Sequence, residues 1–424
     1  MDRQPAATPK DYLSARDAVA LLEVRAQTLY AYVSRGWVRS VTQPGSKEKL
    51  YARADIEKLR ARSQARAGHG AVAASAMHWG EPIIPTSITQ ITSAGPLYRG
   101  QAAVQLARSG ATFEEVAELL WTGALGAPGL RWPGHGQSVE LRRFAASIGA
   151  PSANDQLIEL FALFAMQLGL SRGQAAGQPG GHAVLDAARE LIQTMAGCFG
   201  YASPRCAFYR LRRGEPIAAS VLGALAIPVS AENQACMNAA LVVMSDHELS
   251  PSSFAARVAA SSGASLHSCV AAAACANSGE QMGRLYSQVE QFLARAATRG
   301  ALLRRAVDLQ SRGLAVPGFG HPLYPQGDPR ARLLLDLVEQ RAERSKRLDA
   351  ITKFVADVQG QLGLYPRQEL ALVLLCMALG LPAQTSGAVF TLARTAGWVA
   401  HIREQWLTGV LLRPRAKFVG LSSH

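Results

Sequence analysis

The sequence predicts a mainly α-helical protein, with a small front module ahead of a large helical body. Ala and Leu are abundant while aromatic residues make up only 7%, a balance that favours packed helices over a β-sandwich. From Met77 onward, apolar residues recur at helical spacing, and no block of alternating strands interrupts them. Hydrophobic residues are 49% of 424 and charged residues 18%, which allows a large core and excludes wholesale disorder.

The front module, residues 1–66, begins with two short helices. Ser14 and Asp17 form a capping-box-like start, and the first helix turns an apolar face inward. After a break at Glu23-Val24, a second helix runs to Gly36 and directs three residues inward: Ala26, Leu29 and Val33. Residues 37–41 and 49–51 then predict a hairpin, or wing, and residues 55–66 a final basic helix.

The remaining segments are a linker and the helical body. Residues 67–76 are rich in Gly and Ala and lack apolar periodicity, so they predict a linker. In the body, Thr112 and Glu115 form a second capping box, and Gly123 closes the helix that follows. We divide the body into a large helical domain (77–283), a small helical domain (284–380) and a C-terminal return to the large domain (381–424).

Charge is concentrated at the front. The chain has 44 Lys and Arg against 31 Asp and Glu, a formal net charge of +13. Residues 1–70 hold 13 basic and 7 acidic residues, so the first sixth of the chain carries nearly half of the excess. A concentrated positive end indicates a polyanionic partner.

Location and metal content follow from what the sequence lacks. No apolar run approaches the roughly 18 residues that a membrane helix needs, and residues 1–13 lack the apolar stretch of a signal peptide. The six cysteines include no CxxC pair, so we expect buried thiols in a reducing cytoplasm, no membrane association and no zinc site.

Residues 12–62 resemble the DNA-binding module of the MerR and excisionase-like families, a winged helix-turn-helix. The matching stretch is YLSARDAVALLEVRAQTLYAYVSRGWVRS…KLYARADIEKLRAR, with Glu23 where those families have a small turn residue. The resemblance implies that the second helix enters the major groove of double-stranded DNA. Base contacts then fall to Arg25, Gln27 and Thr28, and phosphate contacts to Tyr32, Arg35, Arg39 and Lys47. A helical module for dimerisation or docking is the alternative.

Four segments of the body carry candidate chemistry: SDHELS (245–250), PGFGHPLY (317–324) with DPR (328–330), LARTAGWVAH (392–401) and RPR (413–415). Two histidines and three arginines spread over these segments suit a small ligand with two carboxylates and a carbonyl group. Arginine forks hold carboxylates bidentately, and imidazole donates to a carbonyl oxygen.

The order and wording of these segments resemble citrate synthase, from about Trp79 to the C-terminus. The resemblance implies a large and a small helical domain and a dimer, either a homodimer or a heterodimer with a paralogue. It also implies a metal-free acyltransferase reaction that condenses oxaloacetate with acetyl-CoA, the co-substrate, to citrate and CoA. By matching motif positions, His247 binds oxaloacetate, His321 polarises its ketone, Arg330 and Arg394 hold its carboxylates, and Arg413 reaches the neighbouring subunit's site.

Two catalytic positions depart from the family. Its motif Gly-Pro-(Leu/Arg)-His-Gly-Gly-Ala falls on residues 279–285, so Met282 replaces the histidine that stabilises the enol oxygen, and Arg284 replaces a glycine. A thioether cannot donate a hydrogen bond, and losing one such donor costs about 10²–10³ in rate. The family's catalytic Asp aligns with Glu369, which keeps the carboxylate but moves it by about one methylene.

Two interpretations therefore stay open. In the first, Glu369 abstracts the proton and Gln281 or a water replaces the lost histidine, giving a working synthase. In the second, the body binds a dicarboxylate or CoA ester without efficient turnover, and domain closure couples its occupancy to DNA. The sequence does not fix the acyl-CoA preference.

Overall fold

The structure is a computed structural model that describes residues 12–22, 24, 26–34, 38–42, 49–53, 55–57, 84–135, 138–149, 151–172, 181–341 and 344–414. It falls into two compact units. The front unit is drawn from Met1–Pro85 and Arg413–His424, and the larger unit spans Thr86–Leu412.

The front unit combines two short helices with a three-stranded antiparallel sheet of order β1-β3-β2. Its elements are β1 (Tyr12–Leu13), α1 (Ala15–Leu22), α2 (Ala26–Ser34), β2 (Ser40–Thr42) and β3 (Lys49–Ala52). Ser14 Oγ accepts from the Asp17 amide at 3.2 Å, as expected of a helix N-cap. β2 pairs with β3, with Ser40 opposite Tyr51, which confirms the predicted hairpin.

The front unit has an apolar core of its own, made by Leu13, Ala18, Leu22, Leu29, Val38, Tyr51 and Ile56. Ala26, predicted to face inward, is exposed, because the first turn of α2 lies at the edge of this core. The predicted basic helix is described only at residues 53 and 55–57, and the rest of it, like the predicted linker, lies outside the described residues.

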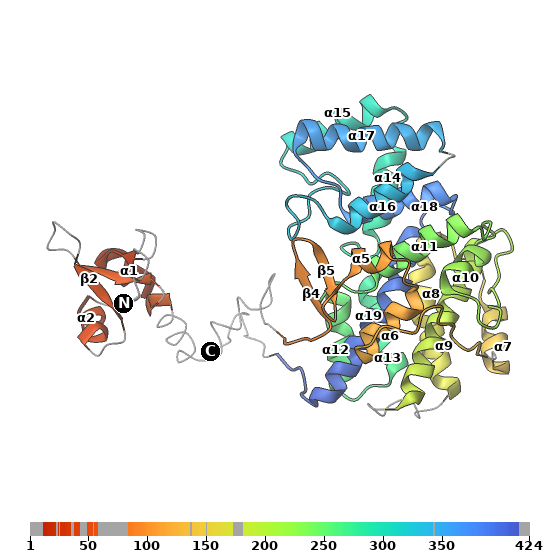
Figure 1. Cartoon of the computed structure of the whole chain (residues 1–424), viewed down its shortest axis with the longest axis horizontal. Coiled ribbons are helices and arrows are strands. Elements are labelled where there is room, and N and C mark those ends of the chain that lie inside the picture. The colour runs from red at the N-terminus through yellow and green to blue at the C-terminus, as the bar shows by residue number, and fades with distance from the viewer. Residues whose placement is uncertain are drawn as a thin grey trace, which may run out of the picture. The chain divides into compact units, whose positions relative to one another are not determined.

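The larger unit confirms the mainly helical prediction (Figure 1). It opens with a three-stranded meander, β4 (Thr89–Thr92), β5 (Gly95–Tyr98) and β6 (Gln101–Ala102). The expectation that no strands interrupt the body is therefore wrong here, because strands of two to four residues are too short to show an alternating pattern. The first helices are α5 (Ala103–Arg108), α6 (Phe113–Thr122), α7 (Val139–Ser147), α8 (Leu157–Arg172), α9 (His182–Cys198), α10 (Ile217–Ala224), α11 (Ala231–Met244), α12 (Pro251–Ser261) and α13 (Leu266–Asn277). Then follow α14 (Leu285–Ala294), α15 (Arg299–Ser311), α16 (Pro329–Gln340), α17 (Lys346–Leu362), α18 (Gln368–Leu379) and α19 (Ser386–Thr408). Short 3-10 helices occupy Asn154–Gln156 and Phe199–Ala202.

Local signals in the sequence explain where these helices begin and end. The predicted capping box of α6 is present in full: Thr112 accepts from the Glu115 amide, and the Glu115 side chain accepts from the Thr112 amide. Gly123 then closes α6 at a φ of +85°. Ser residues cap α7, α11, α12, α13 and α17, in each case by accepting from the backbone amide three residues further along the chain.

The long helix α19 organises the core. It packs against α6, α11, α12 and α13, and all but a few of its 23 residues are buried. In Figure 1, helices α14 to α18 gather at the top of the larger unit, where α16 packs on α18 and α15 on α17. α11 contacts both α16 and α19 and so joins the two groups.

The structure bears on two expectations from the sequence, which concern the burial of the cysteines and membrane-spanning helices. Four of the six cysteines are buried, but Cys206 is half-buried and Cys275 is exposed. Among the described helices, none has both the length and the hydropathy needed to cross a bilayer.

Candidate functional site

The larger unit brings together four of the side chains singled out in the sequence: His247, His321, Arg330 and Arg394. His247 follows α11, His321 lies in the loop before α16, Arg330 is in the first turn of α16, and Arg394 lies in the middle of α19. The charges of both arginines and the His321 ring act on His247. Segments that span about 150 residues of sequence therefore meet at one place. A ligand with two carboxylates and a carbonyl group would require such a cluster.

Tyr324 is the centre of this cluster. Its hydroxyl lies 2.9 Å from His247 Nε2, and its ring lies 4.9 Å from the His321 ring. The Arg330 guanidinium carbon lies 5.6 Å from the centre of the same ring. The Tyr324 side chain is buried, and burial raises its pKa to about 12, so the hydroxyl stays protonated at neutral pH. Tyr324 thus fixes the spacing of the two imidazoles and Arg330.

His321 is held as a neutral hydrogen-bond donor. Burial, followed by the positive charge of Arg330, lowers the pKa of His321 to about 4. Its Nδ1 accepts from the Leu323 amide at 3.1 Å, so the neutral ring carries its proton on Nε2. Nε2 has no hydrogen-bond partner within the described part of the chain, and can therefore donate to a ligand oxygen.

Arg394 is a buried guanidinium without an acidic partner. Its side chain is 2% exposed, and no carboxylate of the described residues lies within ion-pair distance. Nε and one terminal nitrogen are buried without any hydrogen-bond partner, while the guanidinium carbon lies 4.8 Å from the Phe390 ring centre. Burial lowers the pKa of Arg394, although the carboxylate of Asp246 opposes the shift. An unpaired buried cation is costly, so this arrangement favours an anionic ligand.

Arg330 differs, because its fork is already occupied. Asp328 caps α16 and accepts from Arg330 Nε at 3.0 Å and from Nη2 at 2.7 Å, and both side chains are buried. Burial disfavours the charged form of Arg330, but Asp328 outweighs it and raises the pKa of Arg330. The sequence predicted a bidentate carboxylate contact here. In the structure, Asp328 takes that geometry through Nε and Nη2. Nη1 makes no hydrogen bond with the described residues.

The loop of His247 is held by a close approach of α19. The Gly397 amide donates to the Ser245 carbonyl at 3.0 Å, and a Cβ at Gly397 would lie 2.2 Å from Asp246 Oδ1. Asp246 is fully buried, with Oδ2 3.4 Å from His401 Nε2. Burial opposes its charge, but the charge of His401 keeps the pKa of Asp246 below its ordinary value. Only glycine fits at this crossing.

We expect Gly397→Ala to lower the free energy of unfolding by about 1–3 kcal/mol or more, because two backbone segments would have to separate. Denaturant unfolding measures this loss. Gly360→Ala is the matched control, because Gly360 lies in α17 and an added Cβ meets no atom within 4 Å. That change should be neutral or slightly stabilising. Equal losses in the two variants would contradict the close approach.

Glu369 lies at the start of α18 and is joined to the loop of His321. The Arg367 amide donates to the Gly318 carbonyl at 2.8 Å, and the Gly320 amide donates to the Tyr365 carbonyl at 2.9 Å. Gly318 and Gly320 both have positive φ, +83° and +70°, so the turn around Phe319 uses a backbone conformation that favours glycine. The charges of Arg367 and Glu369 both act on His321.

The Glu369 carboxylate is paired within its own segment. It is buried and accepts from Arg367 Nε at 3.0 Å and from Nη2 at 2.8 Å. Arg367 is partly exposed, and its Nη1 contacts no acceptor among the described residues. This fork, which the sequence did not indicate, places a cation directly beside the predicted base.

Met282 lies half-buried in the turn between α13 and α14. The neighbouring Gly283 is tightly enclosed, since a Cβ there would lie 2.5 Å from Ile158 Cδ1. Arg284 points away to α8, where its Nη2 donates to Glu159 at 2.9 Å. Gln281, the expected replacement for the missing histidine, is exposed. None of the described contacts of this turn supplies a donor at the Met282 position.

The two site histidines also predict how stability depends on pH. Burial lowers the pKa of both His247 and His321 below the unfolded value of about 6.5. Between about pH 6.5 and 4 the unfolded chain binds more protons than the folded chain, so the free energy of unfolding should fall as pH falls through this window. Urea unfolding at several pH values tests this. A His247→Gln/His321→Gln variant should show a weaker dependence, and an unchanged slope would contradict it.

The other predicted residues lie away from this cluster or outside the residues that the structure describes. Arg413 is exposed and belongs to the front unit. Among the DNA-contact residues, Gln27 is exposed, and Thr28 and Tyr32 are half-buried. Arg39, predicted to contact phosphate, forms a fork with Asp55 at 2.8 and 3.0 Å, while its side chain stays 75% exposed. Arg25, Arg35 and Lys47 lie outside the described residues.

Sequence reasoning missed four site residues: Tyr324, Asp328, Arg367 and Asp246. All four lie within three residues of a predicted site residue. A search for polar neighbours of each predicted residue would have found them, although not their partners. Among the described residues, no group of three or more His, Cys, Asp or Glu side chains is placed to hold a metal ion.

Comparisons with known proteins agree with this geometry. Residues 77–415 match the family described as "Citrate synthase, C-terminal domain". The chain is 31% identical to a citrate synthase of Haloferax volcanii over 43% of this chain and 49% of that protein. It is 29% identical to a citrate/2-methylcitrate synthase of Bacillus subtilis over 46% of this chain and 53% of that protein. These alignments span about half the length of the curated relatives.

Solved structures share the fold. One is a ternary complex of citrate synthase from Thermoplasma acidophilum with carboxymethyl coenzyme A and oxaloacetate. It covers 81% of this chain and 95% of its own, with a TM-score of 0.65 and 22% identity. The citrate synthase of Thermotoga maritima gives a TM-score of 0.64 over the same shares, also at 22% identity.

Proposed function

The chain belongs to the citrate synthase family, and from that premise we propose that it condenses oxaloacetate with acetyl-CoA to give citrate and CoA. The observation that carries the proposal is the buried Arg394, whose unpartnered guanidinium lies in the same cluster as His247, His321 and Arg330. A keto dicarboxylate matches this set, because one carboxylate neutralises Arg394, the other meets Nη1 of Arg330, and the ketone accepts from His321 Nε2.

The reaction follows from these positions. Glu369 takes a proton from the methyl group of acetyl-CoA, and the electron pair moves onto the thioester oxygen. The resulting carbon nucleophile attacks the ketone carbon of oxaloacetate, while His321 Nε2 donates to the developing alkoxide. Water then cleaves the thioester and releases CoA. Each oxygen of Glu369 accepts one bond from Arg367 and retains a second lone pair for the proton.

The enol oxygen needs a donor that Met282 cannot supply, and in our proposal Arg367 supplies it. Two of its nitrogens hold Glu369, so the guanidinium lies beside the carbon that loses the proton. The thioester oxygen is bonded to the carbonyl carbon, which is the neighbour of the methyl carbon. In our proposal this oxygen therefore lies within reach of Nη1, the Arg367 nitrogen that does not bond to Glu369. A fixed guanidinium also stabilises negative charge more strongly than a neutral imidazole.

A CoA-release assay on the purified full chain tests the proposal. Release should require both oxaloacetate and an acyl-CoA, and comparing acetyl- with propionyl-CoA defines the acyl preference. No release at any acyl-CoA, with oxaloacetate bound, would replace the proposed reaction by ligand sensing.

Ligand sensing is the second candidate. It is favoured by Met282 and by the front unit, which has its own core and the helix and hairpin order of a winged helix-turn-helix. In that case the front unit binds double-stranded DNA, and oxaloacetate binding changes the affinity. A DNA shift assay with and without oxaloacetate separates the candidates.

We also propose that the chain works as a dimer, with Arg413 completing the partner's site. Most residues of α8 are apolar, and three of them, Leu163, Met166 and Leu170, are 50, 41 and 76% exposed along one stripe. Such a stripe fits a second helical surface. Light scattering should give the mass of two chains, and Leu170→Glu should shift it toward one.

A further inference from the structure

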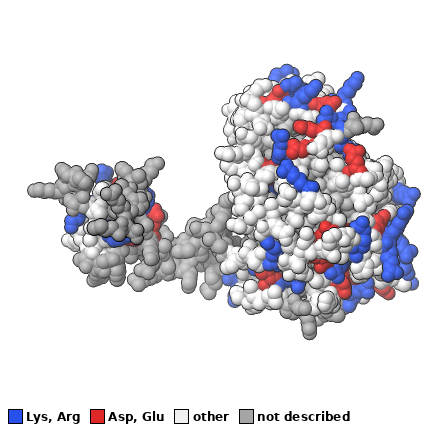
Figure 2. Space-filling model, in the orientation of Figure 1, with Lys and Arg blue, Asp and Glu red and all other residues white. Residues whose placement is uncertain are grey.

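A face of the larger unit, remote from the site in sequence, is rich in exposed arginine. Figure 2 shows Lys and Arg side chains gathered on the side where, in Figure 1, α7 and the loop before α10 lie. We name it the arginine face and define it by six exposed residues: Arg131, Arg143, Arg205, Arg210, Arg212 and Arg213.

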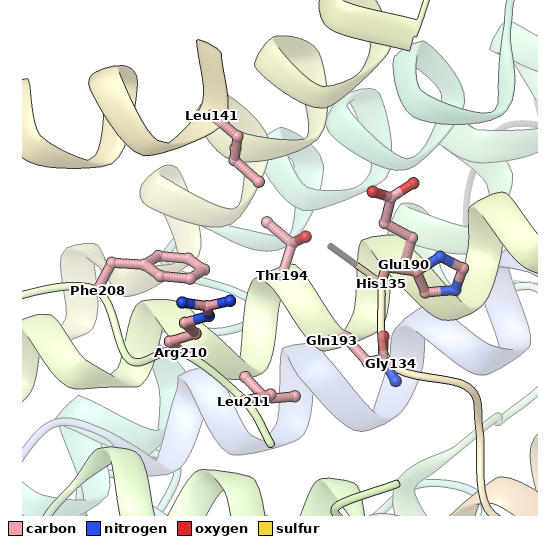
Figure 3. Close-up of a pocket in the computed structure, with 9 residues that line it drawn as sticks. All are labelled: Gly134, His135, Leu141, Glu190, Gln193, Thr194, Phe208, Arg210 and Leu211. Carbon is pink, nitrogen blue, oxygen red and sulfur yellow. The ribbon is translucent and has the colours of Figure 1, made fainter. Parts of the chain in front are cut away.

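Packing brings three segments together to form this face. These segments meet around a small cavity of about 30 Å³. Figure 3 shows the residues that line it: Gly134, His135, Leu141 of α7, Glu190, Gln193 and Thr194 of α9, and Phe208, Arg210 and Leu211. Arg210 and Thr194 are both among the residues that line this junction. A Cβ on Gly134 would lie 3.0 Å from the Arg213 Cα, so the two loops are in close contact.

The charge of the arginine face is not neutralised within the described chain. None of the six guanidiniums forms an ion pair with a described carboxylate, whereas arginines elsewhere, such as Arg189 and Arg257, pair with Glu118 and Glu404. Glu215, the acidic residue closest in sequence to Arg212 and Arg213, accepts from the Arg212 amide, Tyr209 and Ser220. Glu140 of α7 lies near enough to feel the charge of Arg143, but the six arginines still give the face an excess of positive charge at its solvent-exposed surface.

We propose that the arginine face binds the phosphate backbone of double-stranded DNA. All six cations are arginine, whose planar fork matches phosphate oxygens bidentately. The same chain carries a second basic segment, residues 1–70, with 13 basic against 7 acidic residues. Two tethered basic surfaces favour one long polyanion, because binding of the first raises the effective concentration of the second. The arginine face and the front unit are thus both proposed to bind double-stranded DNA. The proposal for the arginine face does not depend on catalysis or on the helix-turn-helix assignment of the front unit.

The test measures binding of the full chain to a fluorescent duplex of arbitrary sequence across salt concentrations. Arg212→Glu/Arg213→Glu should weaken binding by at least about tenfold near 0.1 M salt and reduce the salt slope by about two, since each lost phosphate contact removes roughly 0.9. The matched control is Arg312→Glu/Arg332→Glu, two arginines 62 and 74% exposed that pair with Asp308 and Asp336. It changes net charge equally and should alter affinity less than about threefold.

The outcomes separate this inference from the proposed DNA role of the front unit. If wild type binds duplex and both double variants bind equally well, the arginine face has no role. If Gln27→Glu has no effect while Arg212→Glu/Arg213→Glu weakens binding, the face is upheld and the front-unit assignment is wrong. If wild type ignores duplex but binds vesicles containing phosphatidylserine, the partner is an anionic membrane and the proposal is overturned.

Discussion

Arg394→Met is expected to abolish measurable oxaloacetate binding while making the unliganded protein more stable. The side chain is buried without an acidic partner, and at least two of its nitrogens lack any hydrogen bond. A carboxylate ligand would satisfy them with charge-assisted bonds of about 1.5–3 kcal/mol each, so their loss should raise Kd by at least about 10²-fold. Without ligand, the same charge is uncompensated, and methionine should raise the free energy of unfolding by about 1–3 kcal/mol.

Arg257→Met is the matched control for this prediction. Arg257 is equally buried, but its Nη1 donates to Glu404 at 2.7 Å and its Nε to Gln405 at 2.9 Å. Its removal leaves a carboxylate unpaired and should lower stability by about 3–5 kcal/mol. Calorimetry gives the Kd and urea unfolding gives the stability. If both variants lose stability alike, or Arg394→Met binds oxaloacetate normally, Arg394 is not the ligand's cation.

Arg367→Gln is expected to lower CoA release by about 10²–10³ and to leave oxaloacetate binding unchanged. In the proposed mechanism Arg367 holds Glu369 and supplies the donor at the enol oxygen, whereas oxaloacetate depends on Arg394, Arg330 and His321. Met282→His in the Arg367→Gln background should recover part of the rate, because a donor returns at the position where the family carries one. Arg312→Gln, at an exposed surface pair, is the control.

Whether Arg367→Gln lowers or raises the rate of CoA release decides the role of Arg367. If Arg367 only restrains Glu369, its removal frees the carboxylate and the rate rises. Such a result would remove Arg367 from the mechanism while leaving the family reaction intact. Loss of oxaloacetate binding in Arg367→Gln would indicate damage to the loop that it shares with His321.

Local signals in the sequence were sufficient for much of the fold. The capping box at Thr112 and the glycine at Gly123 bound α6 where expected, because both act within one turn of chain. The hairpin of the front unit was likewise predicted, because its two strands lie close together in the sequence. The edge position of Ala26 was missed, because periodicity identifies a helix face but not where the core ends.

The site was predicted as a set of residues but not as a network. His247, His321, Arg330 and Arg394 follow from their segments and from the family resemblance. The ion pairs of the arginines could not be predicted in this way. Arg330 pairs with Asp328, Arg367 with Glu369 and Arg39 with Asp55, whereas Arg394 has no acidic partner among the described residues. Whether a guanidinium is paired depends on which carboxylates the fold brings within reach. For the same reason the arginine face, built from segments about 60 residues apart, was not visible in the sequence.

Titration of the purified full chain with oxaloacetate by isothermal calorimetry tests the central claim, that Arg394 binds a carboxylate of a dianionic keto acid. We expect saturable binding at one site per chain with a Kd below about 1 mM, weakened at least a hundredfold in Arg394→Met and retained in Arg367→Gln. A folded protein that releases no binding heat at several temperatures, with oxaloacetate well above that concentration, would contradict the reaction and the sensor alike.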